Sequence, residues 1–416
     1  MKILLLSTYF YPDTASTGVI MSKLADMFVT KGHEVTVIAS VPHYDRGAIW
    51  PEYSDRLLYK KVSGSLTVWR LYTHVVRDRA NVLQRILSYG SFHVLSSLVG
   101  LTAPKHDVIL VPSPPLSNGV IGDLIARLRG TPFVYNVQDV WPDVAVRAGV
   151  LKNPRTIRRL RAMEDYVYRR AAGLAVISDG FRDNLLSKGV PAEKVAVIPN
   201  FIDIKHITPQ PKRNRFSTRL GLLEKFVVLF AGNMGFSQGL ETVLDAAKAL
   251  SDYKDICFLM VGNGASRSSA ESYRQELGID NVKFLPFQPW EDLPDVYGAS
   301  DVCLIPLRRG FSSESVPCKV FSIMAAGRPA IASVDRGSST EALILRSGSG
   351  ICVAPEEPKL LAEAILFYYR DASARLRAGE VARQCVEKEF DPDRIADRYL
   401  EILHDATQSR REAIHA

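Results

Sequence analysis

The sequence lacks the patterns of metal centres, disulfide frameworks and membrane spans. Its five cysteines, at positions 257, 303, 318, 352 and 385, form no C-x-x-C pair, which argues against a zinc site or a disulfide framework. No stretch of about 18 apolar residues is present, so we expect no helix that crosses a bilayer. The opening MKILLLS is too short an apolar run for a signal peptide. We therefore expect a cytoplasmic protein in a reducing compartment.

The surplus of positive charge, +7 in all, is local and not spread over the chain. Basic residues crowd one predicted helical segment of the first half: Lys152, Arg155, Arg158, Arg159, Arg161, Arg169 and Arg170. Such a patch can bind an anionic membrane surface or nucleic acid. No nucleic-acid motif is present and no aromatic residues alternate with the basic ones, so we expect no nucleic-acid partner. The alternative to membrane contact is an ordinary solvated helix face.

Strands and helices alternate along the chain in two similar halves. In the first half, strand 2–8, helix 19–30 and strand 33–38 form a βαβ unit, which predicts a parallel sheet. Between residues 204 and 220 the composition becomes polar, basic and proline-bearing, as in a linker. The alternation then restarts with strand 226–231, helix 240–250 and strand 256–261. Since 416 residues exceed what one hydrophobic core usually spans, we expect two domains.

One apolar helix is predicted between these strands, over residues 81–101, with a basic lead-in at Arg77, Arg79 and Arg85. It is apolar over most of its circumference. Such a helix can lie in a membrane interface, or it can be a buried helix of a Rossmann-like layer. The sequence leaves both readings open.

The stretch 310–333 of the second half predicts a loop that starts a short helix. Pro317 is a preferred first helical residue, and Gly327 ends the apolar helical pattern. A helix N-terminus presents free backbone N–H groups and a partial positive charge, which suit a phosphate, and Lys319 adds a cation there. Glu314, just outside, is placed to bind sugar hydroxyls. The alternative is an ordinary core helix with solvated polar residues at its start.

Three residues of the first half are candidates for the same kind of chemistry. Gly18 lies at a strand-to-helix turn, where a glycine lets a ligand approach the backbone closely. Asp139 and Asp143 follow the predicted strand 132–137, at the end where parallel α/β sheets bind ligands. We expect Asp139 and Asp143 to lie on the acceptor side of a ligand site. The alternative for both carboxylates is capping of the basic helix that follows.

Four segments in this order resemble the C-terminal domain of retaining, group-4 glycosyltransferases of the GT-B type. They are GNMGFSQGLETVLDAA, VGNG, NVKFLPFQPWEDLPDVYGASDVCLIPL and VPCKVFSIMAAGRPAIAS. The first-half segments STG, KGHEVTVIA, QDVWPD and KVAVIPNFID also match, so the resemblance covers almost the whole chain. Within that group it is nearest to bacterial exopolysaccharide and capsule enzymes of the colanic-acid or fucosamine-transferase kind.

The resemblance implies an α/β protein with two Rossmann-like domains that face each other across a cleft. Residues 1–204 would form the acceptor domain and residues 205–390 the nucleotide-sugar donor domain. Residues 391–416 would form a helix that returns to the first domain. The nucleotide sugar is then a substrate, and neither a metal ion nor another cofactor is expected, because helix N-termini and side chains bind the diphosphate.

Site residues follow from the resemblance position by position. The first glutamate of the family's E-x7-E motif is Glu314, whereas the second falls on Ser322, a shorter and neutral hydrogen-bonding group. Asn233 and Gln238 stand where many members have a cationic pair, which leaves Lys319 as the clearest cation, with Arg308 and Arg309 as helpers. Glu314, Lys319 and Asp139 are the implied catalytic residues. The implied nucleotide-sugar ligands are Gly18, Gly232, Asn233, Met234, Gly235, Gln238, Gly262, Pro286, Val316, Pro317 and Ser322.

The implied activity is metal-independent sugar transfer with retention, from a nucleotide sugar, with UDP favoured, to a saccharide or polyprenyl-linked saccharide acceptor. It would serve bacterial surface polysaccharide synthesis at the inner face of the plasma membrane, with peripheral contact to anionic lipid. A nucleotide-sugar 2-epimerase of the same fold is one alternative. A non-catalytic partner subunit that binds a nucleotide or a membrane is another.

Overall fold

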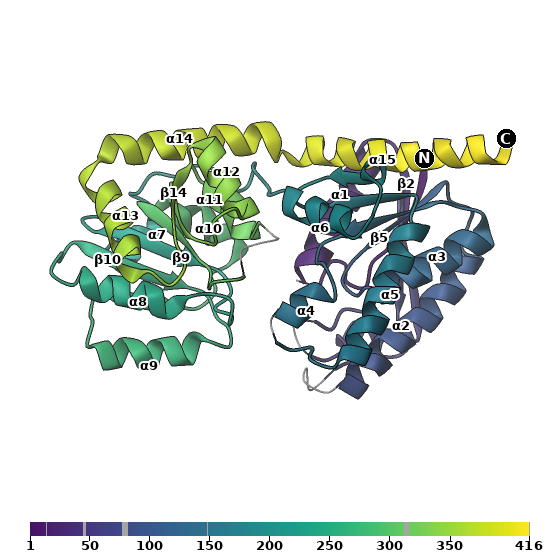
Figure 1. Cartoon of the computed structure of the whole chain (residues 1–416), viewed down its shortest axis with the longest axis horizontal. Helices are drawn as coiled ribbons and strands as arrows, with labels where there is room; N and C mark the ends of the chain where they lie inside the picture. The colour runs from purple at the N-terminus through teal and green to yellow at the C-terminus, as the bar shows by residue number, and fades with distance from the viewer. Residues whose placement is uncertain (14, 45–46, 77–81, 148, 312–315, 416) are drawn as a thin grey trace. The chain divides into compact units, whose positions relative to one another are not determined.

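A computed structural model describes residues 1–13, 15–44, 47–76, 82–147, 149–311 and 316–415. The chain divides into two compact units (Figure 1). The N-terminal unit comprises Met1–Pro199 and Asp393–Ala416, and the C-terminal unit comprises Asn200–Pro392. The sequence placed these divisions after residues 204 and 390.

The N-terminal unit is built on an eight-stranded sheet in the order β3-β4-β2-β1-β5-β6-β7-β8 among the described residues. The strands are β1 Lys2–Leu6, β2 Glu34–Ser40, β3 Leu58–Ser63, β4 Leu66–Leu71, β5 Val108–Pro112, β6 Phe133–Val137, β7 Gly173–Val176 and β8 Val195–Val197. Neighbouring strands run parallel except β3 and β4, which form an antiparallel hairpin. The parallel pairing predicted from the first βαβ unit is confirmed for β1 and β2, and the edge hairpin β3–β4 adds an antiparallel pair that the sequence analysis did not identify.

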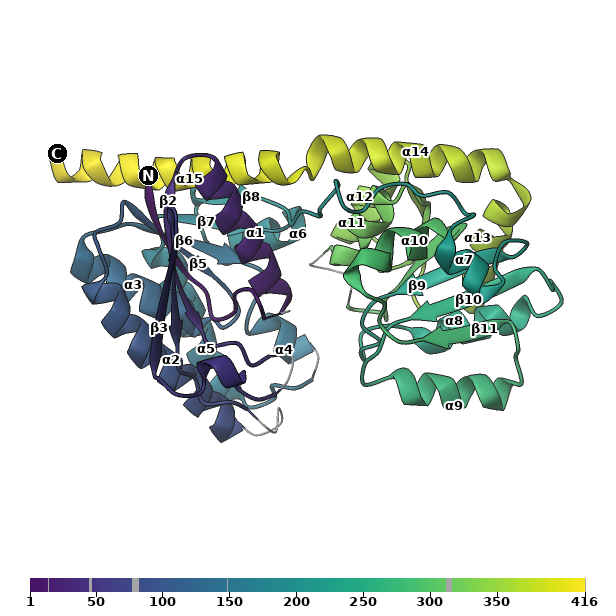
Figure 2. The same cartoon turned by 180° about the vertical axis from the view of Figure 1, so that it is seen from behind.

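Helices cover both faces of this sheet. They are α1 Ser16–Thr30, α2 Val82–Thr102, α3 Ser117–Arg129, α4 Asp143–Arg147, α5 Pro154–Arg170, α6 Asp179–Ser187 and α15 Pro392–His415, with short turns at Pro51–Tyr53 and Ala192–Lys194. The last helix, α15, runs along the N-terminal unit (Figure 2). Its Tyr399 hydroxyl accepts a hydrogen bond of 2.9 Å from Asn136 of β6, and its Asp397 pairs with Lys31 at 2.7 Å.

Helix α2 is a buried layer on one side and an apolar surface on the other. Phe92 and Ser96 are fully buried against α3 and the sheet, whereas Leu87, Val94 and Leu98 are 49%, 62% and 57% exposed. The buried-helix reading is therefore confirmed for the inner face. The outer face keeps an exposed row of apolar side chains.

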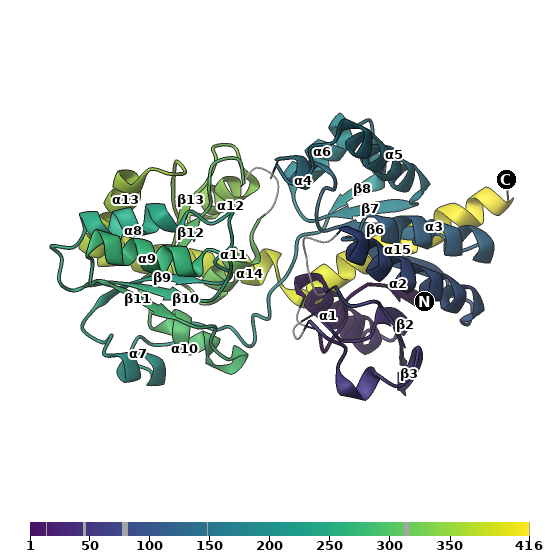
Figure 3. The same ribbon diagram turned by 90° about the horizontal axis from the view of Figure 1, so that it is seen from below.

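Among its described residues, the C-terminal unit has a parallel six-stranded sheet in the order β11-β10-β9-β12-β13-β14. Figure 3 shows this unit from below. Its strands are β9 Phe226–Ala231, β10 Ile256–Val261, β11 Val282–Leu285, β12 Val302–Pro306, β13 Ala330–Ser333 and β14 Gly350–Val353. Its helices are α7 Arg215–Leu220, α8 Leu240–Ala249, α9 Arg267–Leu277, α10 Leu293–Gly298, α11 Cys318–Ala325, α12 Ser339–Ser347, α13 Pro358–Arg370 and α14 Ala372–Glu389, with a short turn at Trp290–Asp292. One apolar core lies on each face of the sheet.

Three local predictions need correction. Helix α7 lies inside the predicted linker, because the Asn214 side chain and Ser217 form a capping box that starts it. Helix α11 begins at Cys318, since Pro317 has an extended ψ of 136° and occupies the N-cap position. Helix α1 begins at Ser16, so Gly18 lies in its first turn.

The strand order fixes where ligands bind. It reverses direction between β1 and β5 in the N-terminal unit and between β9 and β12 in the C-terminal unit. Loops that leave the carboxyl ends of such strands diverge, and the space between them is where open α/β sheets hold their ligands. The two sheets therefore each point to one site.

Candidate functional site

The site of the C-terminal unit lies between the loops that follow β9 and β12. Backbone hydrogen bonds join the two loops: Gly239 donates to Pro306 at 2.8 Å, and Arg308 donates to Ser237 at 2.9 Å. Gln238 also forms an isolated β-bridge with Leu307. The loop after β9, which carries Gly232 to Gln238, is thus held in place at the switch point.

Glycines shape the floor of this site. Gly232 and Gly262 have φ angles of 137° and 147°, a region that residues with a Cβ rarely adopt. A Cβ on Gly262 would overlap the carbonyl oxygen of Gly232, so the loops after β9 and β10 touch through bare backbone. Met234 closes the contact by donating to Asn263 at 2.8 Å and accepting from Ser266 at 2.9 Å.

Lys319, in the first turn of α11, directs its ammonium to these glycines. The Nζ donates to Gln238 Oε1 at 2.8 Å and lies 4.1 Å from the centre of the Phe230 ring. It would lie 3.5 Å from a Cβ built on Gly232. No carboxylate among the described residues forms an ion pair with it at 4.0 Å or less. Burial lowers the pKa of Lys319 to about 7.

The two arginines expected to assist Lys319 are held by carboxylates. One terminal nitrogen of Arg308 donates a hydrogen bond to each carboxylate oxygen of Glu241, at 2.8 and 2.9 Å. The Arg308 guanidinium also lies over the Phe236 ring. Arg309 pairs with Glu356 at 3.6 Å. The sequence did not reveal these partners. Lys319, by contrast, forms no ion pair among the described residues and lies beside Gly232.

The other predicted ligands of this unit lie at different depths. Asn233 and Pro286 are exposed, Val316 and Pro317 are half-buried at the start of α11, and the Met234 side chain belongs to the core. Gly235 follows in the same loop, and a Cβ there would meet Asn233 at 3.1 Å. Ser322 hydrogen-bonds the buried hydroxyl of Tyr297. Glu314 lies outside the described residues, so its position stays a prediction.

Sequence reasoning missed one supporting residue, Arg267 at the start of α9. Its guanidinium donates to the carbonyl oxygens of Gly262 and Leu285, at 2.8 and 3.3 Å, and pairs with Glu271 at 2.9 Å. It therefore fixes the loop after β10. An arginine three residues after the glycine-rich VGNG segment was the available signal.

In the N-terminal unit, Asp139 follows β6 at the carboxyl edge of the sheet. Water reaches its side chain, yet desolvation by the surrounding protein raises the pKa of Asp139 to about 6. Its carboxylate has no hydrogen-bond or ion-pair partner among the described residues. A carboxyl with these properties can accept a proton near neutral pH.

Two other candidates of this unit have structural surroundings. Asp143 is the first residue of α4 and pairs with Lys188 at 2.8 Å and Arg161 at 3.5 Å. Gly18 packs against the loop after β1, where a Cβ would meet Tyr9 at 3.0 Å. The close approach that this glycine permits is to the protein's own backbone at Tyr9 and Phe10. Whether a ligand also approaches it stays a prediction.

Neither a metal cluster nor a membrane span is found in the part of the chain that the structure describes. No three His, Cys, Asp or Glu side chains there converge on a position that could hold a metal ion. No helix built from those residues combines the length and the apolar character needed to cross a bilayer.

Comparison with known proteins matches both units. The family model described as Glycosyl transferase 4-like domain covers residues 17–200, and Glycosyl transferases group 1 covers residues 212–385. The putative colanic acid biosynthesis glycosyl transferase WcaI of Escherichia coli K12 is 29% identical over 411 residues, which are 96% of this chain and 99% of that protein.

Solved structures agree with the fold. Sucrose-phosphate synthase from Thermosynechococcus elongatus has a TM-score of 0.76 at 17% identity, over 98% of this chain and 100% of that one. Anabaena Alr3699/HepE in complex with UDP has a TM-score of 0.74 at 19% identity, over 97% and 100%. At these identities the likeness establishes the fold alone. The predicted α/β architecture with two Rossmann-like domains is confirmed.

Proposed function

Because this chain belongs to the glycosyltransferases of the GT-B fold, we propose that it transfers a sugar from a nucleotide-sugar donor to a saccharide or lipid-linked saccharide acceptor. The proposal includes retention of configuration, no metal requirement and a role in bacterial surface polysaccharide synthesis. The name of the E. coli relative supports that process, and the UDP complex of the Anabaena protein supports UDP as the nucleotide. The observation that carries the proposal is the Lys319 ammonium beside the glycine loops of the β9–β12 switch point.

In this reaction the nucleotide diphosphate leaves as the glycosidic bond breaks, and negative charge builds on its phosphate oxygens. Lys319 and the backbone N–H groups of the Gly232–Gly235 loop and of the α11 N-terminus stabilise that charge. Because these groups are fixed before the substrate binds, little reorganisation is needed in the transition state.

The configuration at the reacting carbon of the sugar is retained if the acceptor oxygen attacks that carbon from the same face that the diphosphate leaves. The acceptor hydroxyl then loses its proton late, to a phosphate oxygen or to Asp139, whose raised pKa of about 6 suits proton acceptance. Glu314 would hold hydroxyls of the donor sugar. The carboxylate-pair rule of glycosidases does not apply, because no covalent sugar–enzyme intermediate is part of this route.

The test is a thermal-shift and hydrolysis screen of the purified protein against UDP-, GDP- and dTDP-sugars in EDTA. We expect stabilisation by one nucleotide, UDP, together with slow release of sugar. Stabilisation by none of them would refute the donor site. Activity that appears only after a divalent cation is restored would refute the metal-independent mechanism.

We also propose peripheral contact with the inner, anionic face of the plasma membrane. Arg155, Arg158 and Arg159 of α5 are exposed, and α2 exposes the apolar row of Leu87, Val94 and Leu98. Basic side chains beside apolar ones bind anionic lipid surfaces. Co-sedimentation with vesicles of phosphatidylglycerol and phosphatidylcholine at low salt is the test. No binding, or equal binding by an Arg155→Gln, Arg158→Gln, Arg159→Gln variant, would refute this contact.

A further inference from the structure

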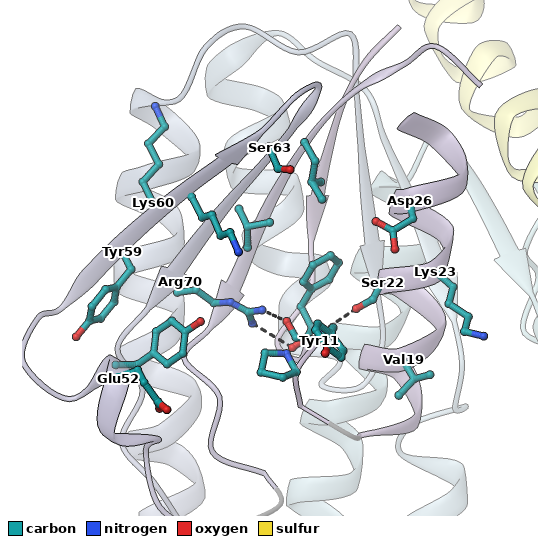
Figure 4. A pocket seen from close by; sticks show the side chains of 16 residues that line it. Tyr11, Val19, Ser22, Lys23, Asp26, Glu52, Tyr59, Lys60, Ser63 and Arg70 are labelled. Atoms are coloured by element: carbon teal, nitrogen blue, oxygen red, sulfur yellow. Dashed lines mark hydrogen bonds between the residues drawn. The ribbon is translucent and has the colours of Figure 1, made fainter. Parts of the chain in front are cut away.

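A groove of about 890 Å³ lies between α1 and the β3–β4 hairpin of the N-terminal unit (Figure 4). Its floor is one face of the hairpin. Tyr59, Lys61 and Ser63 of β3 pair across the ladder with Arg70, Val68 and Leu66 of β4, so all six side chains point to the same side. Leu66 and Val68 are only half-buried, because no element of the unit fully covers this edge of the sheet.

Helix α1 forms the opposite wall. Val19, Ser22, Lys23 and Asp26 recur at helical spacing and line the groove (Figure 4). The wall is therefore mixed, with one apolar side chain, one hydroxyl, one cation and one carboxylate. Desolvation raises the pKa of Asp26, as expected for a carboxyl beside a partly enclosed space.

One end of the groove is the loop after β1, at the carboxyl edge of the sheet. Arg70 is 6% exposed and fixes this loop: it donates to the carbonyl oxygen of Phe10 at 3.0 Å, to that of Ser40 at 3.2 Å, and to that of Tyr11. The Tyr11 ring is left 71% exposed at the mouth. Since β1, β5 and β6 run parallel, Asp139 after β6 lies at the same edge as Tyr11. The groove thus starts at the edge that carries the acceptor-side candidate and runs along β4.

The lining selects among classes of ligand. Hydrocarbon would bury the charges of Lys23, Asp26, Glu52 and Lys61 without compensation. Nucleic acid would bring its phosphates against the carboxylates of Asp26 and Glu52. A sugar chain suits the mixture, because aromatic faces such as those of Tyr11, Tyr53 and Tyr59 pack on its C–H groups while charged and hydroxyl groups bond its hydroxyls.

We propose that this groove binds the acceptor glycan, at the sugar residues that precede the one receiving the new sugar. This inference rests on the proposed function, and it makes the acceptor a chain of at least two sugars. Residues 66–70 of β4 span roughly 13 Å at about 3.3 Å per residue, which is longer than one sugar ring. The groove contributes to the choice of acceptor, because short saccharides reach only its loop end.

The test is binding of the full chain to a printed array of bacterial surface glycans and their mono-, di- and oligosaccharide fragments. Tyr11→Ala and Lys61→Ser remove groove contacts without touching the core, because Tyr11 is held by its backbone and Lys61 is exposed. Val62→Ser, on the opposite face of the same strand and 60% exposed, is the matched control. Phe287→Ala, an exposed aromatic of the C-terminal unit, controls for loss of surface area.

We expect binding to oligosaccharides and not to monosaccharides, weakened at least tenfold by Tyr11→Ala and by Lys61→Ser and unchanged in both controls. UDP affinity, measured by calorimetry on the same samples, should be equal in all variants. No glycan binding by the wild type, or equal binding by the groove variants, overturns the inference. The inference is also overturned if the groove variants lose vesicle binding and keep their glycan binding. If UDP fails to bind the wild type, the proposed donor site is refuted instead. Glycan binding on the array is measured without UDP, so it tests the groove independently of the donor site.

Discussion

Replacing Lys319 with methionine should make the unliganded protein more stable and the enzyme inactive. Methionine is unbranched like lysine and only one atom shorter, so it can still pack on Phe230, and it removes the charge. The pKa of Lys319 falls from its ordinary 10.5 to about 7, which corresponds to roughly 4 kcal/mol at pH 7 at about 1.36 kcal/mol per unit. Water reaches this half-buried side chain, and its contacts with Gln238 Oε1 and the Phe230 ring favour the charged form. We therefore expect about half of that value, ~2 kcal/mol.

The pH dependence follows from proton counting. Between pH 7 and 10.5 the unfolded chain holds a proton on this lysine that the folded chain has lost, so the wild type gains stability as pH rises through that window. The advantage of Lys319→Met is therefore full below pH 7 and disappears toward pH 10.5. For a unit of this size ~2 kcal/mol is about 4–8 °C in melting temperature.

Four measurements decide the matter. Calorimetric melting between pH 6.5 and 10 should show the variant above the wild type, with a gap that closes as pH rises. UDP should raise the melting temperature of the wild type and leave that of Lys319→Met nearly unchanged, and turnover should fall at least ~100-fold. UDP binding at pH 8 should take up a fraction of a proton, because the diphosphate completes the charge of a lysine whose pKa is lowered in the free protein. Lys359→Met, an exposed lysine of α13, is the control. A variant that melts below the wild type and still binds UDP would refute the reasoning.

Three further predictions concern other parts of the site. Gly262→Ala should lower stability by several kcal/mol and abolish UDP binding, because the new Cβ overlaps the Gly232 carbonyl oxygen. The control Gly278→Ala has a φ of 61° and open space around it, so it should cost only about 1–2 kcal/mol. Equal melting temperatures of the two variants would contradict this. Asp139→Asn should lower kcat, and in the wild type kcat/KM should fall as pH drops through about 6, since a base must be deprotonated; a flat acid limb would exclude Asp139 as base. Glu314→Gln should cut turnover at least ~100-fold at unchanged UDP affinity if Glu314 holds the donor sugar, and near-normal turnover would remove it from the site.

Much of the fold could be read from the chain. Central strands such as β9 and β10 are short apolar runs followed by glycine, and they were predicted to the residue. Predictions failed for elements whose secondary structure depends on their tertiary contacts. The hairpin β3–β4 reads as polar and irregular because it is an exposed edge, and α7 was hidden in a segment whose proline and charge suggested a linker.

The amino-acid sequence by itself determined the two α/β units, their family, and the glycine and lysine positions of the proposed donor site, because strand runs, glycine turns and motif order are local properties. Only the tertiary structure decided which cations are available there. Arg308 and Arg309 are paired with Glu241 and Glu356, far along the chain, whereas Lys319 faces Phe230 and Gln238. The groove beside α1 is likewise a product of strand pairing. Pairing across the sheet sets burial and ion pairs, and no local pattern encodes either.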